Sequence, residues 1–194
     1  MTTLRSFIAV EIPPVIQQAI QHEIEPLRGA LGPGLVRWVA CQNLHVTLKF
    51  LGDISSETLG MLANMLTLEA GRVQSFPIRV SGLGSFPTPK RARVLWVGLH
   101  APAELSTLQR GIESAAAKLG YAAEARPFSP HLTIGRVRQQ ATASDQQSIW
   151  KTFERSHIGD LGNAEISAVH LYKSELSRGG AVYTKLFSAP LKTS

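Results

Sequence analysis

Two four-residue segments of this chain pair a histidine with a threonine two positions later. Residues 45–48 read His-Val-Thr-Leu, and residues 131–134 read His-Leu-Thr-Ile. Side chains alternate between the two faces of a β-strand, so the His and Thr of each segment project from one face and the aliphatic residues from the other. Two such strands could place two imidazoles and two hydroxyls around one cleft.

That set of groups suits phosphate chemistry. One neutral imidazole can remove a proton, one protonated imidazole can donate a proton, and hydroxyls can bind oxygens on which negative charge develops. His45 and His131 are therefore the candidate acid–base pair, with Thr47 and Thr133 beside them. The simpler interpretation is that threonine, a good strand former, lies near a histidine by chance. The repetition of the pattern makes this interpretation unattractive. The remaining histidines are interpreted as structural or surface residues: His22, His100, His157 and His170.

Arg136 is a further candidate, five positions after His131. In a regular strand this odd spacing places Arg136 on the opposite face, whereas a bulge near Gly135 would turn it toward the histidines. A guanidinium group there would bind phosphate oxygens through its planar fork. The alternative is an arginine that only contacts solvent.

Other catalytic classes find no support in the sequence. Zinc sites need three or four ligands, yet the chain has one cysteine, no His-Glu-x-x-His segment and no acidic cluster near either histidine. The Gly-x-Ser-x-Gly turn of serine hydrolases and the glycine-rich loop of ATP-binding proteins are also missing from the sequence. We therefore predict chemistry without a metal or another cofactor.

Composition describes an ordinary globular chain of 194 residues with a formal net charge of +6. The positive charge favours polyanionic partners such as RNA, although the basic residues are spread along the chain. Cys41 is the only cysteine, so no intramolecular disulfide can form, which fits the cytoplasm. No long apolar segment indicates a signal peptide or a membrane span. We expect a cytoplasmic monomer with no membrane association.

The elements expected to position these residues are strands and helices in alternation. The predicted strands are 7–11, 36–40, 44–51, 76–83, 94–99, 128–137, 166–176 and 181–191. The predicted helices run from Pro14 toward Leu27, from a cap at Ser55 or Ser56 to residue 70, from 102 to 119 and from 145 to 155. The last two strands form a hairpin around Arg178-Gly179-Gly180.

Several smaller features complete this pattern. Residues 29–34 are predicted to be a flexible glycine-rich connection, and Gly52-Asp53 to end the first histidine strand. Three aromatic residues are expected in the core rather than as platforms for a base: Trp38, Phe50 and Trp96. A proline-rich basic loop is expected to be exposed and could contact an RNA backbone through Lys90, Arg91 and Arg93.

The order of elements indicates an internal duplication, because each histidine strand follows one helix and precedes another. The expected fold is α+β, with two lobes that face each other and each contribute one strand to a shared cleft. We find no linker long enough to separate independent domains, so residues 1–194 are predicted to form one domain of two intimate lobes.

Four segments resemble the 2H phosphoesterase superfamily, most closely its bacterial and archaeal RNA 2′,3′-cyclic phosphodiesterase branch, also described as 2′-5′ RNA ligase. They are residues 7–13, Phe-Ile-Ala-Val-Glu-Ile-Pro; 37–39, Arg-Trp-Val; 43–52, Asn-Leu-His-Val-Thr-Leu-Lys-Phe-Leu-Gly; and 130–136, Pro-His-Leu-Thr-Ile-Gly-Arg. The resemblance covers most of the chain, and the motif positions match.

This resemblance implies a bilobal fold with a pseudo-twofold axis, antiparallel sheet with helices outside, and a metal-free cleft between the lobes. It implies that His45, Thr47, His131 and Thr133 act in catalysis and that Arg136 contacts phosphate. It further implies that RNA ending in a 2′,3′-cyclic phosphate, tRNA fragments included, is opened to a 2′-phosphate, and that the reverse reaction joins RNA through a 2′-5′ linkage. The sequence does not distinguish the acid from the base, and we take His131 as the base for water and His45 as the acid for the predictions below.

Two alternatives stay open at this point. A related 2H phosphodiesterase could act on 2′-5′ oligoadenylate or on small cyclic nucleotides. The chain could instead be an RNA-binding module without catalysis, although intact residues at both motifs argue against that interpretation.

Overall fold

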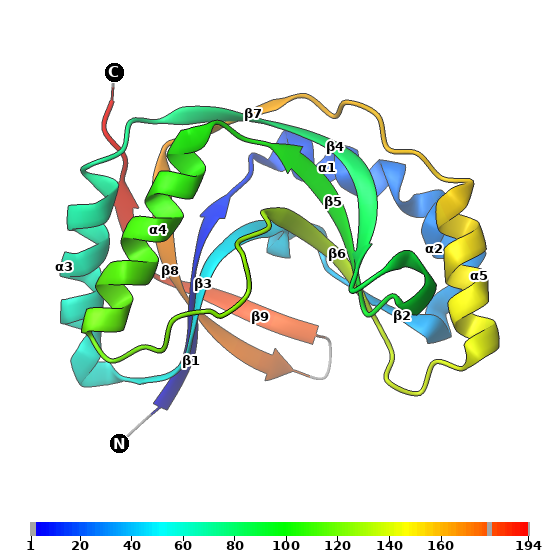
Figure 1. Cartoon of the computed structure of the whole chain (residues 1–194), viewed down its shortest axis with the longest axis horizontal. Helices are drawn as coiled ribbons and strands as arrows, with labels where there is room; N and C mark the ends of the chain where they lie inside the picture. Colours follow the sequence, from blue (N-terminus) through cyan, green and yellow to red (C-terminus); the bar gives the residue numbers. More distant parts are fainter. Residues whose placement is uncertain (1–2, 178–179, 194) are drawn as a thin grey trace.

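The computed structural model describes residues 3–177 and 180–193. The fold consists of helices packed on one curled sheet, whose neighbouring strands are antiparallel (Figure 1). The strand order is β7-β4-β5-β6-β3-β1-β8-β9, and β2 pairs with β6. The predicted α+β class with antiparallel sheet is confirmed.

The strands range from three residues in β2 to eleven residues in β3, β4 and β9. They are β1 (Thr3–Glu11), β2 (Val36–Trp38), β3 (His45–Ser55), β4 (Phe76–Phe86), β5 (Val94–His100), β6 (His131–Val137), β7 (Asn163–Ile166), β8 (Ala168–Ser177) and β9 (Gly180–Pro190). The α-helices are α1 (Pro14–Glu23), α2 (Glu25–Leu35), α3 (Leu59–Ala70), α4 (Ala103–Lys118) and α5 (Ala143–Glu154). Short 3₁₀ turns are η1 (Cys41–Asn43), η2 (Ser56–Thr58) and η3 (Pro89–Arg91).

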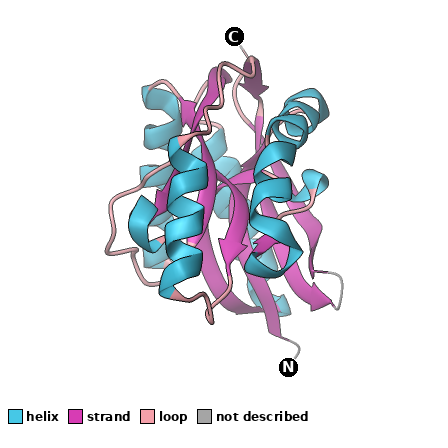
Figure 2. Cartoon of the chain, turned by 90° about the vertical axis from the view of Figure 1, so that its right-hand side faces the viewer, coloured by secondary structure: helices cyan, strands magenta, loops and turns pink. Residues whose placement is uncertain are grey.

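One face of the sheet packs against the helices and forms the main core. Val46, Leu48, Leu132 and Ile134 from the two central strands are buried in this core. Figure 2 shows helices packed along the strands of the sheet. Burial of aliphatic side chains on one face is what turns the other face of β3 and β6 toward solvent.

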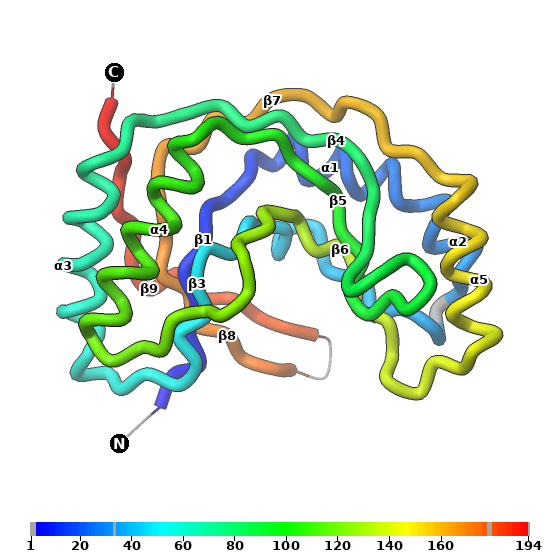
Figure 3. Tube along the Cα trace, viewed as in Figure 1, coloured from blue at the N-terminus to red at the C-terminus, as the bar shows by residue number. Residues whose placement is uncertain are grey.

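The two sequence halves exchange helices across the sheet. α1 and α2 follow β1 and reach the flank of α5, whereas α4 follows β5 and lies beside α3 (Figure 3). α4 contacts β3, and α2 contacts β2 and α5. Each flank is therefore assembled from helices of both halves, so neither half has a complete core of its own.

Two glycine predictions are wrong. Residues 29–34 lie inside α2, where Gly32 alone departs from helical angles with φ +68° and produces a kink. β3 continues past Gly52-Asp53 and pairs with β1 as far as Ser55. Gly52 adopts φ +74°, a left-handed conformation that costs glycine little, so the strand passes through the irregularity without ending.

Helix and strand ends also differ from the prediction. Ser55 holds the N-cap position of η2, which continues directly into α3, but its side chain makes no capping hydrogen bond, and neither does that of Thr58 at the N-cap of α3. The hydroxyl of Thr58 instead donates to the Ser55 carbonyl at 2.8 Å. The strand expected from residue 128 begins at His131, and the predicted strand 166–176 is divided between β7 and β8.

The C-terminal hairpin has the predicted partners. β8 and β9 pair from Ala168 with Pro190 to Ser177 with Gly180. The predicted turn residues Arg178 and Gly179 lie outside the described residues. Across the described ranges, no helix combines the length and the hydropathy needed to cross a bilayer.

Candidate active site

The two histidine segments meet at the centre of the sheet. Val46 in β3 and Leu132 in β6 are Cα partners in an antiparallel pair, and they occupy the same position in their segments. When equivalent residues of two antiparallel strands face each other, a local twofold axis passes between them. The register therefore brings His45 beside Thr133 and Thr47 beside His131. All four side chains project from the face that the helices leave uncovered, and all four are partly buried.

Matching bulges extend this pseudo-symmetry beyond the four residues. In β3 the register against β1 shifts at Leu48, and in β6 the register against β5 shifts at Ile134. The first seven residues of β3 have the same burial pattern as the seven residues of β6. The position two residues after each bulge is exposed, and it holds Phe50 in β3 and Arg136 in β6.

The bulge in β6 decides the orientation of Arg136. Val137 is buried in the main core, so its exposed neighbour Arg136 projects from the opposite face, the one that carries His131. The guanidinium of Arg136 lies close enough to both imidazoles to lower the pKa of His45 and of His131. The structure thus brings together all five predicted residues.

Each imidazole is oriented by its own strand. Nδ1 of His45 donates to the carbonyl of Asn43, and Nδ1 of His131 donates to the carbonyl of Ser129, both at 2.7 Å. A carbonyl oxygen can only accept, so Nδ1 must carry the proton in both rings. Nε2 of each histidine is then the nitrogen that can exchange a proton with a ligand.

Burial makes both imidazoles poor at holding a second proton. It lowers the pKa of His45 to about 4, opposed by the Asn43 carbonyl and assisted by the positive charges of Arg136 and His131. The pKa of His131 is also lowered, first by burial and then by Arg136. At neutral pH both rings are neutral until an anion enters and favours the charged form.

The threonine hydroxyls and Arg136 are available to a ligand. Across residues 3–177 and 180–193, the side chains of Thr47, Thr133 and Arg136 make no hydrogen bond and no ion pair with protein. Their polar groups share a face with two Nε2 atoms. Hydroxyl and guanidinium donors in that arrangement can bind the non-bridging oxygens of a phosphate.

Aromatic rings that sequence reasoning missed pack around the histidines. Phe7 stacks on His45 with ring centroids 4.8 Å apart, and Tyr183 meets His45 edge-on at 5.3 Å. Phe86 meets His131 edge-on at 5.0 Å. These residues come from β1, β9 and β4, so no local spacing links them to the motifs. The sequence indicates only that Phe7 and Tyr183 lie in strands, through the alternation of apolar and polar residues around them.

The expectation that three aromatic residues lie in the core is only partly met. Phe50 is 65% exposed, so its assignment to the core is wrong. The bulge at Leu48 reverses the alternation and turns Phe50 outward. Trp96 is partly buried near His131, at 6.4 Å between ring centroids, and Trp38 is partly buried under the guanidinium of Arg28.

Glu11 introduces an asymmetry between the two histidines. It is the Cα partner of His45, whereas the partner of His131 in β5 is Gly98. The Glu11 carboxylate accepts from the Tyr172 hydroxyl and pairs with Lys185 at 2.9 Å. Burial raises the pKa of Glu11, and these two donors outweigh it and lower that pKa overall. Glu11 therefore stays ionised and favours a positive charge on His45.

The chain matches the model of a known family. The model of the 2′-5′ RNA ligase superfamily matches residues 16–178, which include both histidine strands and Arg136. The matched range covers most of the chain and most of the sheet described above.

Individual proteins agree with this match. The chain is 31% identical to an RNA 2′,3′-cyclic phosphodiesterase of Methanothermobacter thermautotrophicus, over 94% of this chain and 96% of the relative. It is also 31% identical to the Escherichia coli protein of the same name, over 94% and 93%. The structure of E. coli LigT complexed with 3′-AMP superposes with a TM-score of 0.75 at 30% identity, covering 98% of this chain and 99% of LigT. A Thermus thermophilus structure superposes with a TM-score of 0.77 at 26% identity, with the same coverage.

Proposed function

The chain belongs to the 2′-5′ RNA ligase superfamily, and we propose that it opens RNA 2′,3′-cyclic phosphate ends to 2′-phosphates by two-histidine catalysis. It is a cyclic phosphodiesterase of this family, similar over nearly its full length to relatives that bear that name. The observation that carries the proposed chemistry is the pair of histidine–threonine segments around the Val46–Leu132 axis, with both Nε2 atoms available.

The proposed reaction is an in-line displacement at phosphorus. His131 removes a proton from water at Nε2 while the water oxygen bonds to phosphorus. The bond between phosphorus and the 3′-oxygen breaks, and His45 donates its Nε2 proton to that oxygen. The phosphate stays on the 2′-oxygen. Thr47, Thr133 and Arg136 donate to the non-bridging oxygens as their negative charge grows.

The assignment of His45 as the acid is supported by its neighbours. Glu11 lies opposite His45 in the β1–β3 pair and stabilises the protonated ring, whereas Gly98 opposite His131 offers no charge. Burial and Arg136 oppose protonation of His45 in the ligand-free protein. The substrate phosphate supplies the negative charge that offsets them, so the acid gains its proton together with the substrate.

The same groups serve a second reaction of the cyclic phosphate, which joins RNA. A 5′-hydroxyl that replaces water as the nucleophile bonds to phosphorus, the 3′-oxygen again leaves with a proton from His45, and a 2′-5′ linkage results. We propose that this exchange is reversible, because cleavage of that linkage uses the same two proton transfers in the opposite direction.

The setting of the reaction is proposed on more general grounds. We propose that residues 1–194 work as one domain of two lobes, supported by the exchange of α1, α2 and α4 between the halves. We propose a cytoplasmic monomer that acts on RNA ends such as those of tRNA fragments. The single cysteine and the net charge of +6 support the cytoplasm and a polyanionic substrate.

Product analysis of two substrates tests the proposal. A single-stranded RNA with a 2′,3′-cyclic phosphate end and a 2′,3′-cyclic mononucleotide are incubated with the purified protein, and the ends formed are identified by chromatography. We expect 2′-phosphate ends from both. A 3′-phosphate product would reverse the proposed geometry, and absence of turnover on both substrates would refute the assigned activity.

A further inference from the structure

The connection between β4 and β5 is joined to the candidate site at both ends. Phe86, the last residue of β4, packs on His131, and Val94, the first residue of β5, is the Cα partner of Arg136. η3 lies between these two anchors and contacts α5. η3 is therefore part of a connection whose two ends border the site.

Six cationic residues gather along this connection and the adjoining ends of β2 and β6. We call them the basic track: Arg37, Lys90, Arg91, Arg93, Arg136 and Arg138. All six are exposed, and none forms an ion pair with a carboxylate in the described ranges. Hydrogen bonds join the Arg93 segment to the end of β6, since the Val137 main-chain nitrogen donates to the Arg93 carbonyl at 3.0 Å and the Arg93 guanidinium donates to the Arg138 carbonyl at 3.4 Å.

The basic track keeps its positive charge because no acidic residue is near it in the chain. Residues 26–52, 70–103 and 125–144 contain no aspartate or glutamate. Arg37 and Arg136 are Cα partners in the β2–β6 pair, and like charges directly opposite each other destabilise a sheet. Asp145 at the start of α5 accepts from the main chain and hydroxyl of Thr142. A bound polyanion would relieve the repulsion between Arg37 and Arg136.

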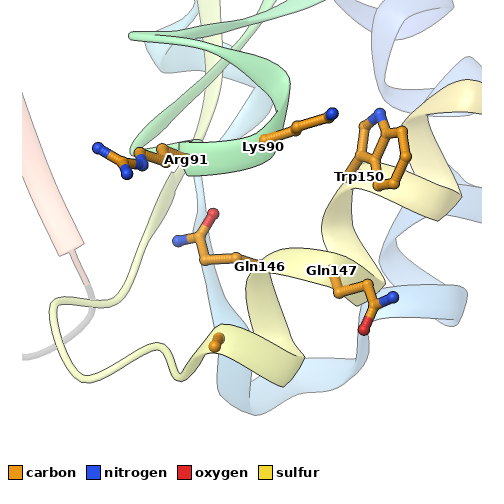
Figure 4. Close-up of a pocket in the computed structure, with 6 residues that line it drawn as sticks. Lys90, Arg91, Gln146, Gln147 and Trp150 are labelled. Atoms are coloured by element: carbon orange, nitrogen blue, oxygen red, sulfur yellow. The ribbon is translucent and has the colours of Figure 1, made fainter.

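The far end of the track opens into a hollow between η3 and α5. The hollow has a volume of about 370 Å³ and is lined by Lys90, Arg91, Ala143, Gln146, Gln147 and Trp150. The Lys90 ammonium lies 4.9 Å from the centroid of the Trp150 ring, and Figure 4 shows Arg91 turned away from that ring. A cation–π contact positions the ammonium and leaves its charge free to attract an anion.

We propose that the basic track and this hollow bind the RNA chain upstream of its cyclic phosphate end. Lys90 and Arg91 hold the phosphate of a nucleotide on the 5′ side, and the base of that nucleotide lies against Trp150. This inference rests on the proposed function and adds a substrate preference to it. A cyclic mononucleotide reaches only Arg136 at the near end of the track, whereas RNA also gains contacts along the rest of it.

The first test compares two substrates in matched variants. Lys90→Gln/Arg91→Gln removes two charges from the track, and Arg110→Gln/Lys118→Gln removes two exposed charges from α4 on the other flank. The measured quantity is kcat/KM for cyclic-phosphate-ended RNA divided by kcat/KM for the cyclic mononucleotide. We expect the track variant to lower this ratio about ten-fold and the control to keep it. An unchanged ratio in the track variant, or an equal fall in the control, overturns the inference.

The second test measures binding without turnover. Fluorescence anisotropy follows a hydroxyl-ended single-stranded RNA across salt concentrations, for which each neutralised phosphate contributes about 0.7 to the slope of log K against log salt. Loss of two contacts should reduce the slope by about 1.4 in the track variant. A slope equal to that of the wild type overturns the inference.

Trp150 is tested with the same RNA and with inorganic polyphosphate, which has no bases. The Trp150→Phe variant should bind RNA more tightly than the Trp150→Ala variant, because phenylalanine keeps an aromatic ring. Both variants should bind polyphosphate with the same affinity. Equal RNA affinities of the two variants would overturn the role of the ring.

The proposed activity and the proposed RNA-binding track can fail separately. Salt-dependent RNA binding through the track without hydrolysis of either substrate refutes the activity alone, whereas hydrolysis with an unaltered substrate ratio refutes the track alone.

Discussion

At the scale of single residues, the two histidines share one geometry in different surroundings. Both rings are fixed through Nδ1 by a main-chain carbonyl two residues earlier. His45 is stacked on Phe7 and faces Glu11, whereas His131 meets Phe86 edge-on and faces Gly98. One repeated motif therefore supplies two imidazoles that can take different roles.

Replacing either histidine should remove most of the hydrolysis. Loss of a general acid or base typically costs about 10²–10⁴-fold in rate, so we expect kcat for His45→Ala and His131→Ala to fall by that range. Thr47→Ala and Thr133→Ala should weaken turnover less, since each removes one of several donors. The measurement is steady-state hydrolysis of a cyclic-phosphate RNA, with circular dichroism as the control for folding. A folded histidine variant with near-wild-type turnover would contradict the assigned roles.

The pH dependence should follow the lowered pKa values. The base must be neutral and the acid protonated, so activity rises and then falls with pH. Burial lowers the pKa of His45 to about 4 and also lowers that of His131. The bell in kcat/KM, which reports the free enzyme, should therefore centre below the ordinary histidine value of about 6.5.

The profile of kcat supplies the control for that argument. Bound phosphate favours the protonated imidazole, so the bell in kcat should lie at higher pH than the bell in kcat/KM. The two limbs belong to the coupled pair of rings and not to named residues. A rate that is flat between acid and alkaline pH would be incompatible with the two-histidine mechanism.

At the scale of elements, the close approach of β2 to β6 positions Arg136. Gly135 makes this approach possible, because a Cβ at this position would lie 2.7 Å from Val36 Cγ1 and 3.2 Å from Trp38 Cε3. Val36 is buried and its χ1 is restricted by β-branching, so it cannot move aside freely. The conformation that carries the Arg136 guanidinium toward the histidines thus depends on glycine at position 135, which has no Cβ.

Gly135→Ala should lower activity through this packing. We expect overpacking to destabilise the protein by about 1–3 kcal/mol and to lower kcat/KM by roughly ten-fold as β2 and Arg136 shift. Chemical denaturation and steady-state kinetics measure the two effects. Gly29→Ala in α2 is the matched control, since its Cβ meets nothing within 4 Å, and it should stabilise the helix by about 0.5–1 kcal/mol. Equal behaviour of the two variants would contradict the argument.

At the scale of the whole molecule, a buried ion pair links β3 to α4. The Lys49 ammonium is almost fully buried and lies 2.5 Å from both Glu113 Oε1 and the Ala122 carbonyl. Glu113 also accepts from the main chain of Glu124 at 2.8 Å. Lys49 is the pseudo-symmetric equivalent of Gly135, so the two lobes use one position for different purposes.

Breaking this pair should destabilise the fold. Lys49→Met leaves Glu113 without its partner, and we expect a loss of about 3 kcal/mol in the free energy of unfolding. Lys49→Met/Glu113→Leu removes both charges and should recover part of that loss. Urea denaturation of these two variants and of Glu113→Leu alone measures the difference. If the double variant were as unstable as the sum of its single changes, the pairing argument would be wrong.

Activity should persist in the presence of a chelator. Within residues 3–177 and 180–193, no three His, Cys, Asp or Glu side chains gather in a way that could hold a metal ion, and the proposed proton transfers use imidazoles alone. We expect hydrolysis in EDTA at the rate measured without it. Loss of turnover that one particular divalent ion restores would show that a metal takes part.

The sequence by itself determined the family and most of the elements. The alternation of His and Thr with aliphatic residues predicted both the strands and the face on which the four side chains lie, because period two and burial are local properties. The resemblance carried by residues 43–52 and 130–136 identified the family, which the match over residues 16–178 confirms. The odd spacing of Arg136 left two orientations open.

Only the tertiary structure decided how these parts combine. The Val46–Leu132 pairing, the bulges at Leu48 and Ile134, and the exchange of helices all depend on contacts between distant segments. Local sequence patterns do not indicate which distant segments pair with each other. For this reason the sequence places Phe50 in the core and does not indicate the rings around His45 and His131. A bulge reverses the alternation of every later side chain, so a single long-range pairing determines which residues reach the site.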